Sequence, residues 1–287
     1  MNAQSLLIFG LGYSGRAVAA MARDAGYVVT GTARAPASAA ELPGVALVAF
    51  DEAEPALAEA SHVLITAAPG EGGCPVHARY GEAMRAQAGL LWIGYCSTTG
   101  VYGDRQGGVV TEADEPAPGS ARARRRVAAE KDWAGFAGRC AVDLIRLAGI
   151  YGPGRSVLDD LRAGEARRIV RPGHRFSRIH RDDIAMGVLA AMRTAGPAGL
   201  RVLNFADDEP APSAEVIEAA AELLGIEPPP ALRFEEAEPR MSEMARSFWA
   251  ENRIVDNART KEMLGIGWRY PSYREGLRAI LAAESAA

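Results

Sequence analysis

The sequence has few of the residues that build metal centres and disulfide networks. Its 287 residues include three cysteines (Cys74, Cys96 and Cys140) and four histidines, and their spacing fits no metal site. Because three cysteines cannot pair completely, we expect reduced thiols in a cytoplasmic protein. All apolar runs are far shorter than the roughly 20 residues of a membrane span. The first predicted strand begins at residue 5, which we take to leave no room for a signal peptide.

An excess of positive charge is also lacking. The chain holds 32 Lys and Arg against 36 Asp and Glu, a formal net charge of −4. This balance disfavours a nucleic acid or an anionic membrane as partner. With 48% hydrophobic and 24% charged residues, the composition is that of a globular enzyme with a large buried core. A small-molecule substrate is therefore the expected partner, and nothing in the sequence predicts an oligomeric state.

The sequence does contain a glycine-rich turn close to its start. The segment Gly10-Leu11-Gly12-Tyr13-Ser14-Gly15 follows a short apolar run and enters a predicted helix. In such a unit Gly10 permits the tight turn, Gly12 lets the backbone approach a pyrophosphate, and Gly15 lets the helix pack on the strand. The amides of Tyr13 and Ser14, with the helix dipole, then hold the anion. Glycines also occur in turns that bind nothing, but this context favours dinucleotide binding.

Short apolar runs alternate with helical segments up to about residue 150. Strands separated by helices form right-handed βαβ units and a parallel sheet that is covered on both faces. We therefore predict an α/β fold with a doubly wound Rossmann domain at residues 1–150. Residues 151–287 are predicted to form mainly a smaller α/β substrate lobe, partly interleaved with that domain. The predicted strands are Ser5–Phe9, Tyr27–Thr32, Val45–Phe50, His62–Thr66, Leu90–Tyr95 and Val142–Arg146, and the helices between them lie near 14–25, 54–60, 75–88 and 120–137.

The ends of the next strands favour NADP(H) as the dinucleotide, with NAD(H) as the alternative. The second predicted strand ends at Thr32, which we assign to the cofactor site, and it lacks the acidic residue that would bind a ribose 2′-hydroxyl. Arg34 instead offers a planar cation to a 2′-phosphate, unless it is an ordinary solvated arginine. Asp51 either accepts from the adenine amino group or caps the following helix. The small segment Ala67-Ala68-Pro69 either lies against the cofactor or is a plain turn.

Three later segments resemble motifs of the extended short-chain dehydrogenases/reductases. Residues 97–104 resemble their S-S-x-x-V-Y-G motif, residues 146–154 their R-x-x-N-V-Y-G-P-G motif, and residues 179–185 their I-H-V-D-D motif. The resemblance covers most of the chain. It implies a Rossmann domain with a substrate lobe and NAD(P)-linked chemistry on a sugar nucleotide or another carbonyl or alcohol. By the same resemblance, the segment Ala148-Gly149-Ile150 is assigned to the cofactor site.

The sequence departs from that superfamily at its acid/base motif, Y-x-x-x-K. Arg122 occupies the tyrosine position and Arg126 the lysine position. The guanidinium group of an arginine does not give up its proton near neutral pH, so Arg122 cannot replace a phenol as proton donor, although Arg126 can still hold ribose hydroxyls as a cation. The chain is therefore most similar to an atypical branch of the superfamily, the bacterial YeeZ-type relatives of NAD-dependent epimerases/dehydratases.

Several side chains are candidates for the chemistry. Thr98 aligns with the superfamily serine that orients a substrate carbonyl, or else it caps the next turn. Tyr102 is the phenol nearest in sequence that could donate a proton, although its counterpart in the superfamily usually packs in the core. Tyr151 is a second candidate proton donor of the same kind. Arg122 is predicted as a substrate-side cation that shares a helix face with Arg126, against the alternative of a solvated helix face. Arg178 and His180 are predicted to hold substrate, although His180 also fits a structural link between lobes.

The expected function is an NADP(H)-dependent oxidoreductase that acts on a small anionic or nucleotide-linked carbonyl or alcohol. The missing tyrosine leaves two alternatives open. One is a non-catalytic protein that senses NADP(H). The other is a redox-neutral epimerase or dehydratase that retains its cofactor.

Overall fold

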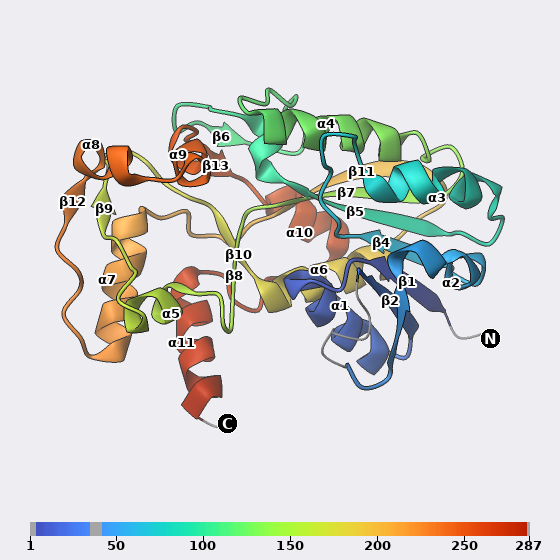
Figure 1. Ribbon diagram of the computed structural model, residues 1–287, viewed down its shortest axis with the longest axis horizontal. Coiled ribbons are helices and arrows are strands. Elements are labelled where there is room, and N and C mark those ends of the chain that lie inside the picture. Colours follow the sequence, from blue (N-terminus) through green and yellow to red (C-terminus); the bar gives the residue numbers. More distant parts are fainter. Residues whose placement is uncertain (1–3, 35–41, 286–287) are drawn as a thin grey trace.

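A parallel seven-stranded sheet forms the centre of the computed structural model, which describes residues 4–34 and 42–285 (Figure 1). The strand order is β11-β7-β5-β4-β1-β2-β3, and every neighbouring pair is parallel. All six predicted strands are present, with ends shifted by a few residues at most, and the predicted α/β class is confirmed. The strands are β1 (Ser5–Phe9), β2 (Val28–Ala33), β3 (Val45–Ala49), β4 (His62–Ile65), β5 (Trp92–Thr98), β7 (Ala141–Leu147) and β11 (Gly199–Phe205).

Helices cover both faces of this sheet. Because the strands are buried on both sides, their sequences are nearly continuous apolar runs rather than alternating ones. One face packs against α1, α6 and α10, and the other packs against α2, α3 and α4. The bounds of these helices are α1 (Tyr13–Asp24), α2 (Glu54–Ala58), α3 (Pro75–Ala86), α4 (Ala121–Ala134), α6 (Arg181–Arg193) and α10 (Ala258–Leu264).

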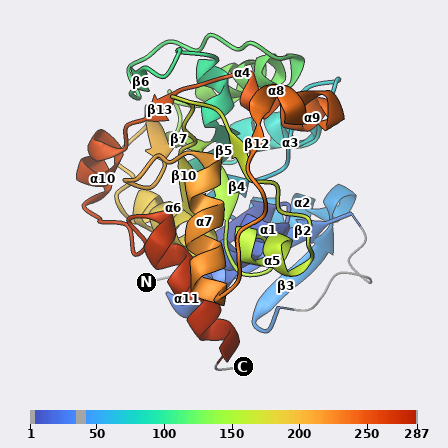
Figure 2. The same cartoon turned by 90° about the vertical axis from the view of Figure 1, so that its left-hand side faces the viewer.

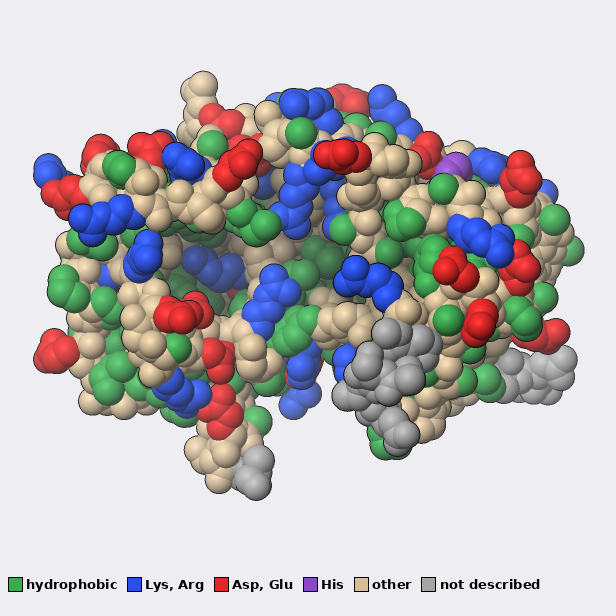
Figure 3. Space-filling view, viewed as in Figure 1, with side chains coloured by type: hydrophobic (Ala, Val, Ile, Leu, Met, Phe, Trp, Pro, Cys, Tyr) green, Lys and Arg blue, Asp and Glu red, His purple; other side chains and the backbone are tan. Residues whose placement is uncertain are grey.

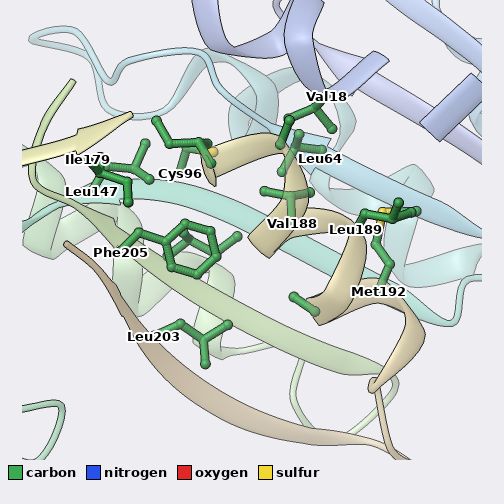
Figure 4. Packing of buried hydrophobic residues seen from close by; sticks show 14 of the residues in the cluster. Val18, Leu64, Cys96, Leu147, Ile179, Val188, Leu189, Met192, Leu203 and Phe205 are labelled. Atoms are coloured by element: carbon green, nitrogen blue, oxygen red, sulfur yellow. The ribbon is translucent and has the colours of Figure 1, made fainter. Parts of the chain in front are cut away.

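A glycine allows close packing between α6 and the last strand of the sheet. A Cβ atom on Gly187 would lie 2.6 Å from the ring of Phe205, so only glycine lets this helix lie directly on β11. Val188 of α6, Val18 of α1 and Leu203 of β11 fill the same layer (Figure 4). This layer joins residues from the start of the chain and from the segment after residue 150 in one core.

Residues after 150 contribute to the sheet and also form a second lobe. Strand β11 and helix α6 belong to the sheet domain, whereas α5, α7 and α11 pack together in a separate apolar cluster (Figure 2). Short strand pairs, β8 with β10, β9 with β12 and β6 with β13, connect distant segments. The remaining elements are β6 (Val109–Val110), β8 (Gly149–Tyr151), α5 (Val157–Arg162), β9 (Ile169–Val170), β10 (Arg178–His180), α7 (Ser213–Leu224), β12 (Leu232–Arg233), α8 (Phe234–Ala237), α9 (Glu243–Trp249), β13 (Ile254–Val255) and α11 (Tyr273–Ser285), with single 3-10 turns at Phe50–Glu52, Thr99–Tyr102 and Glu238–Arg240.

The described residues form neither a membrane-spanning helix nor a cluster of metal ligands. Within residues 4–34 and 42–285, no helix has both the length and the apolar character needed to cross a membrane. The same residues contain no group of three or more His, Cys, Asp or Glu side chains arranged to hold a metal ion.

Candidate functional site

The glycine-rich turn lies at the carboxyl end of β1 and leads directly into α1. Gly10 has a φ of +108°, a conformation that favours glycine. A Cβ atom on Gly15 would lie 2.3 Å from the carbonyl oxygen of Gly10, so the backbone at the start of the helix packs directly against the backbone of the turn. Gly12 is the N-cap of α1 and no side-chain hydrogen bond caps this helix. The first-turn amides, including those of Tyr13 and Ser14, therefore suit an anion.

The neighbouring strands hold this turn in place. The Thr32 hydroxyl of β2 accepts a hydrogen bond from the Gly10 amide at 3.1 Å, and the Thr32 carbonyl accepts from the Leu11 amide. After β4, the Thr66 hydroxyl donates to the Gly10 carbonyl at 2.6 Å. Thr32, which we predicted as a cofactor contact, thus holds the glycine-rich turn in place through two hydrogen bonds.

Other predicted cofactor residues follow the same edge of the sheet. Arg34 is exposed just after β2, and Asp51 is exposed in the 3-10 turn after β3. Helix α2 has Ala53 at its N-cap with no side-chain cap, so the alternative of Asp51 as helix cap is not realised. The segment Ala67-Ala68-Pro69 follows β4, and the Ala67 amide donates to the Phe9 carbonyl at 3.2 Å.

The Tyr13 side chain has a second role that the sequence did not indicate. Its hydroxyl donates to the Pro153 carbonyl at 3.0 Å, which links the glycine-rich turn to the turn after β8. The guanidinium groups of Arg155 and Arg181 lie 5.6 and 5.1 Å from its ring centroid. Burial raises the pKa of this phenol, so its hydroxyl stays protonated and serves as a donor.

A cavity of about 400 Å³ opens between the sheet domain and the second lobe. In the space-filling view, arginine and lysine side chains gather around hollows on this face (Figure 3). Four arginines and a single glutamate line the cavity, so its charge favours an anionic occupant. The lining residues are Thr98–Gly100, Ser120, Arg122, Ala123, Ala148–Tyr151, Arg175–Arg178, Ser213, Ser247–Trp249, Glu251, Arg253 and Val255.

The structure places Thr98 and the two aligned arginines differently. Thr98 ends β5 and lines the cavity, and its hydroxyl accepts from the Gly100 amide at 3.2 Å, so it caps the following 3-10 turn, while a role toward a substrate stays a prediction. Arg122, in the first turn of α4, is exposed and lines the cavity. Arg126 is buried instead and donates to the Cys96 carbonyl at 2.7 Å. Arg126 therefore supports the end of β5 from inside.

Arg178 and Tyr151 enter the cavity wall from the strand pair β8 and β10. Nη1 of Arg178 donates to the carbonyls of Phe176 and Ala211 at 2.9 and 3.0 Å. Burial lowers the pKa of this arginine, while the buried Asp207 acts in the opposite direction. The Tyr151 hydroxyl contacts the Ser272 carbonyl at 3.4 Å, and burial raises the pKa of this phenol. Tyr151 is thus a wall residue rather than a ready proton donor.

The structure speaks against two candidate residues. Tyr102 is fully buried, and its hydroxyl donates to Asn204 at 2.7 Å, so it points into the core rather than into the cavity. His180 is also buried and is not among the lining residues. Its Nδ1 accepts from the Asp182 amide and caps α6, and burial lowers its pKa to about 4. His180 is therefore a neutral structural residue.

Several residues of the cavity were missed from the sequence. Phe248 of α9 lines the cavity and is 56% exposed. Arg253 and Glu251 also line it. Both follow α9 in an irregular stretch without a motif, where only tertiary structure shows their position.

Several known proteins match this chain over nearly their whole length. A solved structure of a functionally unknown conserved protein from Silicibacter pomeroyi DSS is 41% identical, with a TM-score of 0.87, and the match covers 98% of this chain and 99% of that one. Protein YeeZ of Escherichia coli strain K12 is 27% identical over 93% of this chain and 97% of its own length. MoeE5, solved in complex with UDP-glucuronic acid and NAD, is 22% identical with a TM-score of 0.75, covering 99% and 100%. No protein-family model matches the sequence.

These comparisons confirm the resemblance inferred from the motifs. The structural neighbours have the fold of NAD-dependent epimerases/dehydratases, and YeeZ is a distant homologue. The Silicibacter protein is close enough, and matched over enough of its length, to define a common family. The chain therefore belongs to the family of that Silicibacter pomeroyi protein, and it shares its fold with NAD-dependent epimerases/dehydratases.

Proposed function

We propose that this chain is an NAD(P)-dependent oxidoreductase that acts on a small anionic or nucleotide-linked carbonyl or alcohol. The dinucleotide would lie along the carboxyl edge of β1, β2, β4 and β5, with its diphosphate on the first-turn amides of α1. The substrate would occupy the neighbouring cavity. The observation that carries this proposal is the meeting of Thr98 with four arginines in one cavity at that same edge. In open α/β sheets this edge is where ligands bind.

The residues present suit a nicotinamide dinucleotide. The uncapped start of α1 and the close contact of Gly15 with Gly10 leave room for a diphosphate at the backbone. MoeE5, which has the same fold, was solved with NAD bound. When bound, the nicotinamide would supply or accept the hydride. Thr98 would orient the substrate oxygen, and Arg122 and Arg178 would bind carboxylate or phosphate groups.

We expect Arg34→Asp to weaken NADPH binding about 10–100-fold while changing NADH affinity less than about twofold. The exposed arginine follows β2, where it can meet a 2′-phosphate through charge-assisted hydrogen bonds, each worth about 1.5–3 kcal/mol. Titration calorimetry with both dinucleotides measures the difference. Equal losses for NADPH and NADH would contradict the preference for NADP(H).

The proposed reaction is tested by incubating the protein with NADPH or NADP⁺ and a pool of carbonyl and alcohol metabolites, while nicotinamide absorbance is followed. We expect steady turnover that Thr98→Ala lowers about 100-fold, the size expected for losing one oriented hydroxyl. Thr98→Ser is the matched control, because it keeps the hydroxyl and should retain most of the rate. Dinucleotide binding without turnover of any compound would favour a non-catalytic NADP(H) sensor.

A redox-neutral epimerase or dehydratase is the second candidate. It is favoured by the fold that the chain shares with NAD-bound sugar-nucleotide enzymes such as the UDP-glucuronic acid 4-epimerase of Bacillus cereus. Such an enzyme must recover its cofactor in every cycle. Dinucleotide that remains bound through purification, with no net change in nicotinamide absorbance during turnover, would favour this candidate over the oxidoreductase.

A further inference from the structure

Hydride transfer at an alcohol also requires a group that accepts the hydroxyl proton. The superfamily's tyrosine position holds Arg122, which cannot exchange a proton near neutral pH. The hydroxyl of Tyr102 is bonded to Asn204 in the core, and that of Tyr151 faces the Ser272 carbonyl. Among the described residues that line the cavity, one side chain is a carboxylate, and this is Glu251.

Glu251 lies beside the start of α4, the helix that carries Arg122 at the tyrosine position. It follows α9, a helix that both ribbon views draw near α4 (Figures 1 and 2), and its side chain is 14% exposed. Its Oε1 atom would lie 3.1 Å from a Cβ atom on Gly119. Gly119 directly precedes Ser120, the N-cap of α4, and Arg122 stands in the first turn of that helix. The carboxylate therefore reaches from the second lobe to the start of α4.

Arg253 fixes this carboxylate and connects it to the Thr98 segment. Its Nη1 atom donates to Oε2 of Glu251 at 2.7 Å and to the Gly103 carbonyl at 2.9 Å. Its Nη2 atom would lie 3.8 Å from a Cβ atom on Gly100, whose amide is bound by the Thr98 hydroxyl. The pair thus bridges the two segments that carry Thr98 and Arg122.

We propose that Glu251 is the proton-transfer residue of this site and that Arg253 is its positioning residue, an inference that rests on the proposed oxidoreductase function. In the oxidative direction, the alcohol O–H bond breaks and its proton passes to the Glu251 carboxylate. The C–H bond breaks as well, its hydride reduces NAD(P)⁺, and a C=O bond forms. The protonated carboxyl then returns its proton to solvent. In the reductive direction the same carboxyl protonates the oxygen.

The test uses the full chain, NADP⁺ or NADPH, and the substrate pair found in the metabolite screen. Glu251→Gln keeps the size of the side chain but cannot accept the proton. We expect it to lower kcat about 100–1000-fold, while calorimetry gives a dinucleotide affinity within about twofold of the unchanged protein. Glu251→Ala should be rescued by added formate, a small carboxylate that fits the vacated space. Glu243→Gln, at the exposed start of α9, is the matched control and should retain the full rate.

Arg253 is tested by a conservative pair of substitutions. Arg253→Met removes the cation that holds the carboxylate, and we expect a fall in kcat with little change in KM. Arg253→Lys restores a cation and should recover most of the lost rate. Melting temperatures of all variants report whether each one is folded.

The outcomes separate this inference from the function on which it rests. A folded Glu251→Gln variant that keeps its kcat, or one that only raises KM, overturns the role of Glu251 while the oxidoreductase function stands. A Glu251→Ala variant that formate does not rescue at any concentration also overturns it. If the unchanged protein binds dinucleotide but turns over no substrate, the oxidoreductase function fails, and the proton-transfer role fails with it.

Discussion

Replacing Gly15 with alanine should lower the affinity for NADPH at least about 100-fold and also destabilise the fold. The added Cβ would lie 2.3 Å from the Gly10 oxygen and 3.3 Å from its carbonyl carbon, both backbone atoms that cannot rotate away. The turn and the start of α1 must then separate, which misplaces the amides proposed to bind the diphosphate. Overpacking of this kind costs about 1–3 kcal/mol. Calorimetry and thermal unfolding measure the two effects.

Gly12→Ala distinguishes lost binding from lost folding. Within residues 4–34 and 42–285, no heavy atom outside the two adjoining residues lies within 4 Å of the Cβ position at Gly12, and its φ of −78° is allowed for alanine. We therefore expect an unchanged melting temperature. The new methyl group would, however, occupy space that the dinucleotide phosphates need, so NADPH affinity should still fall about tenfold or more. A Gly12→Ala variant that binds NADPH normally would mean that the diphosphate does not approach this turn.

The sheet domain could be predicted because its strands carry a strong local pattern. Fully buried parallel strands are continuous apolar runs, and the runs that became β1, β4 and β7 each adjoin a clear helical segment. The pairs β6 with β13 and β9 with β12 have two residues per strand. Strands so short have no periodicity to detect, and tertiary contacts alone decide where they form.

The site could be predicted only where the backbone determines it. The glycine pattern located the turn because glycine is required there by φ and by close approach. The sequence does not show in the same way in which direction a side chain points. Tyr102 and Thr98 lie four residues apart in one motif, yet one points into the core and the other lines the cavity. Glu251 carries no local pattern, and its position depends on the ion pair with Arg253.

A large loss of stability is expected on substitution of Glu130, which forms a buried ion pair with Arg146 next to the end of β5. Nη2 of Arg146 lies 2.8 Å from Oε2 of Glu130, and each side chain is 5% exposed. Glu130→Ala would leave the Arg146 charge buried and unpaired, which costs about 3–5 kcal/mol. Because each kcal/mol of lost stability lowers the melting temperature by about 2–4 °C in a chain of this size, the melting temperature should fall by roughly 6–20 °C. The exposed pair of Arg79 and Glu54 is the matched comparison, and Glu54→Ala should cost less than about 1 kcal/mol.

A double variant shows whether the loss of stability comes from the unpaired charge of Arg146. Glu130→Ala with Arg146→Met removes both charges, so it should be more stable than Glu130→Ala alone. Glu130 also accepts a hydrogen bond from the Ser97 hydroxyl, directly before Thr98. The double variant should therefore regain stability but not the full turnover rate, because the end of β5 loses an anchor beside the cavity. A double variant that is no more stable than Glu130→Ala would show that the unpaired charge of Arg146 does not cause the loss. A loss below about 1 kcal/mol for Glu130→Ala would show that this pair does not hold the strand end in place.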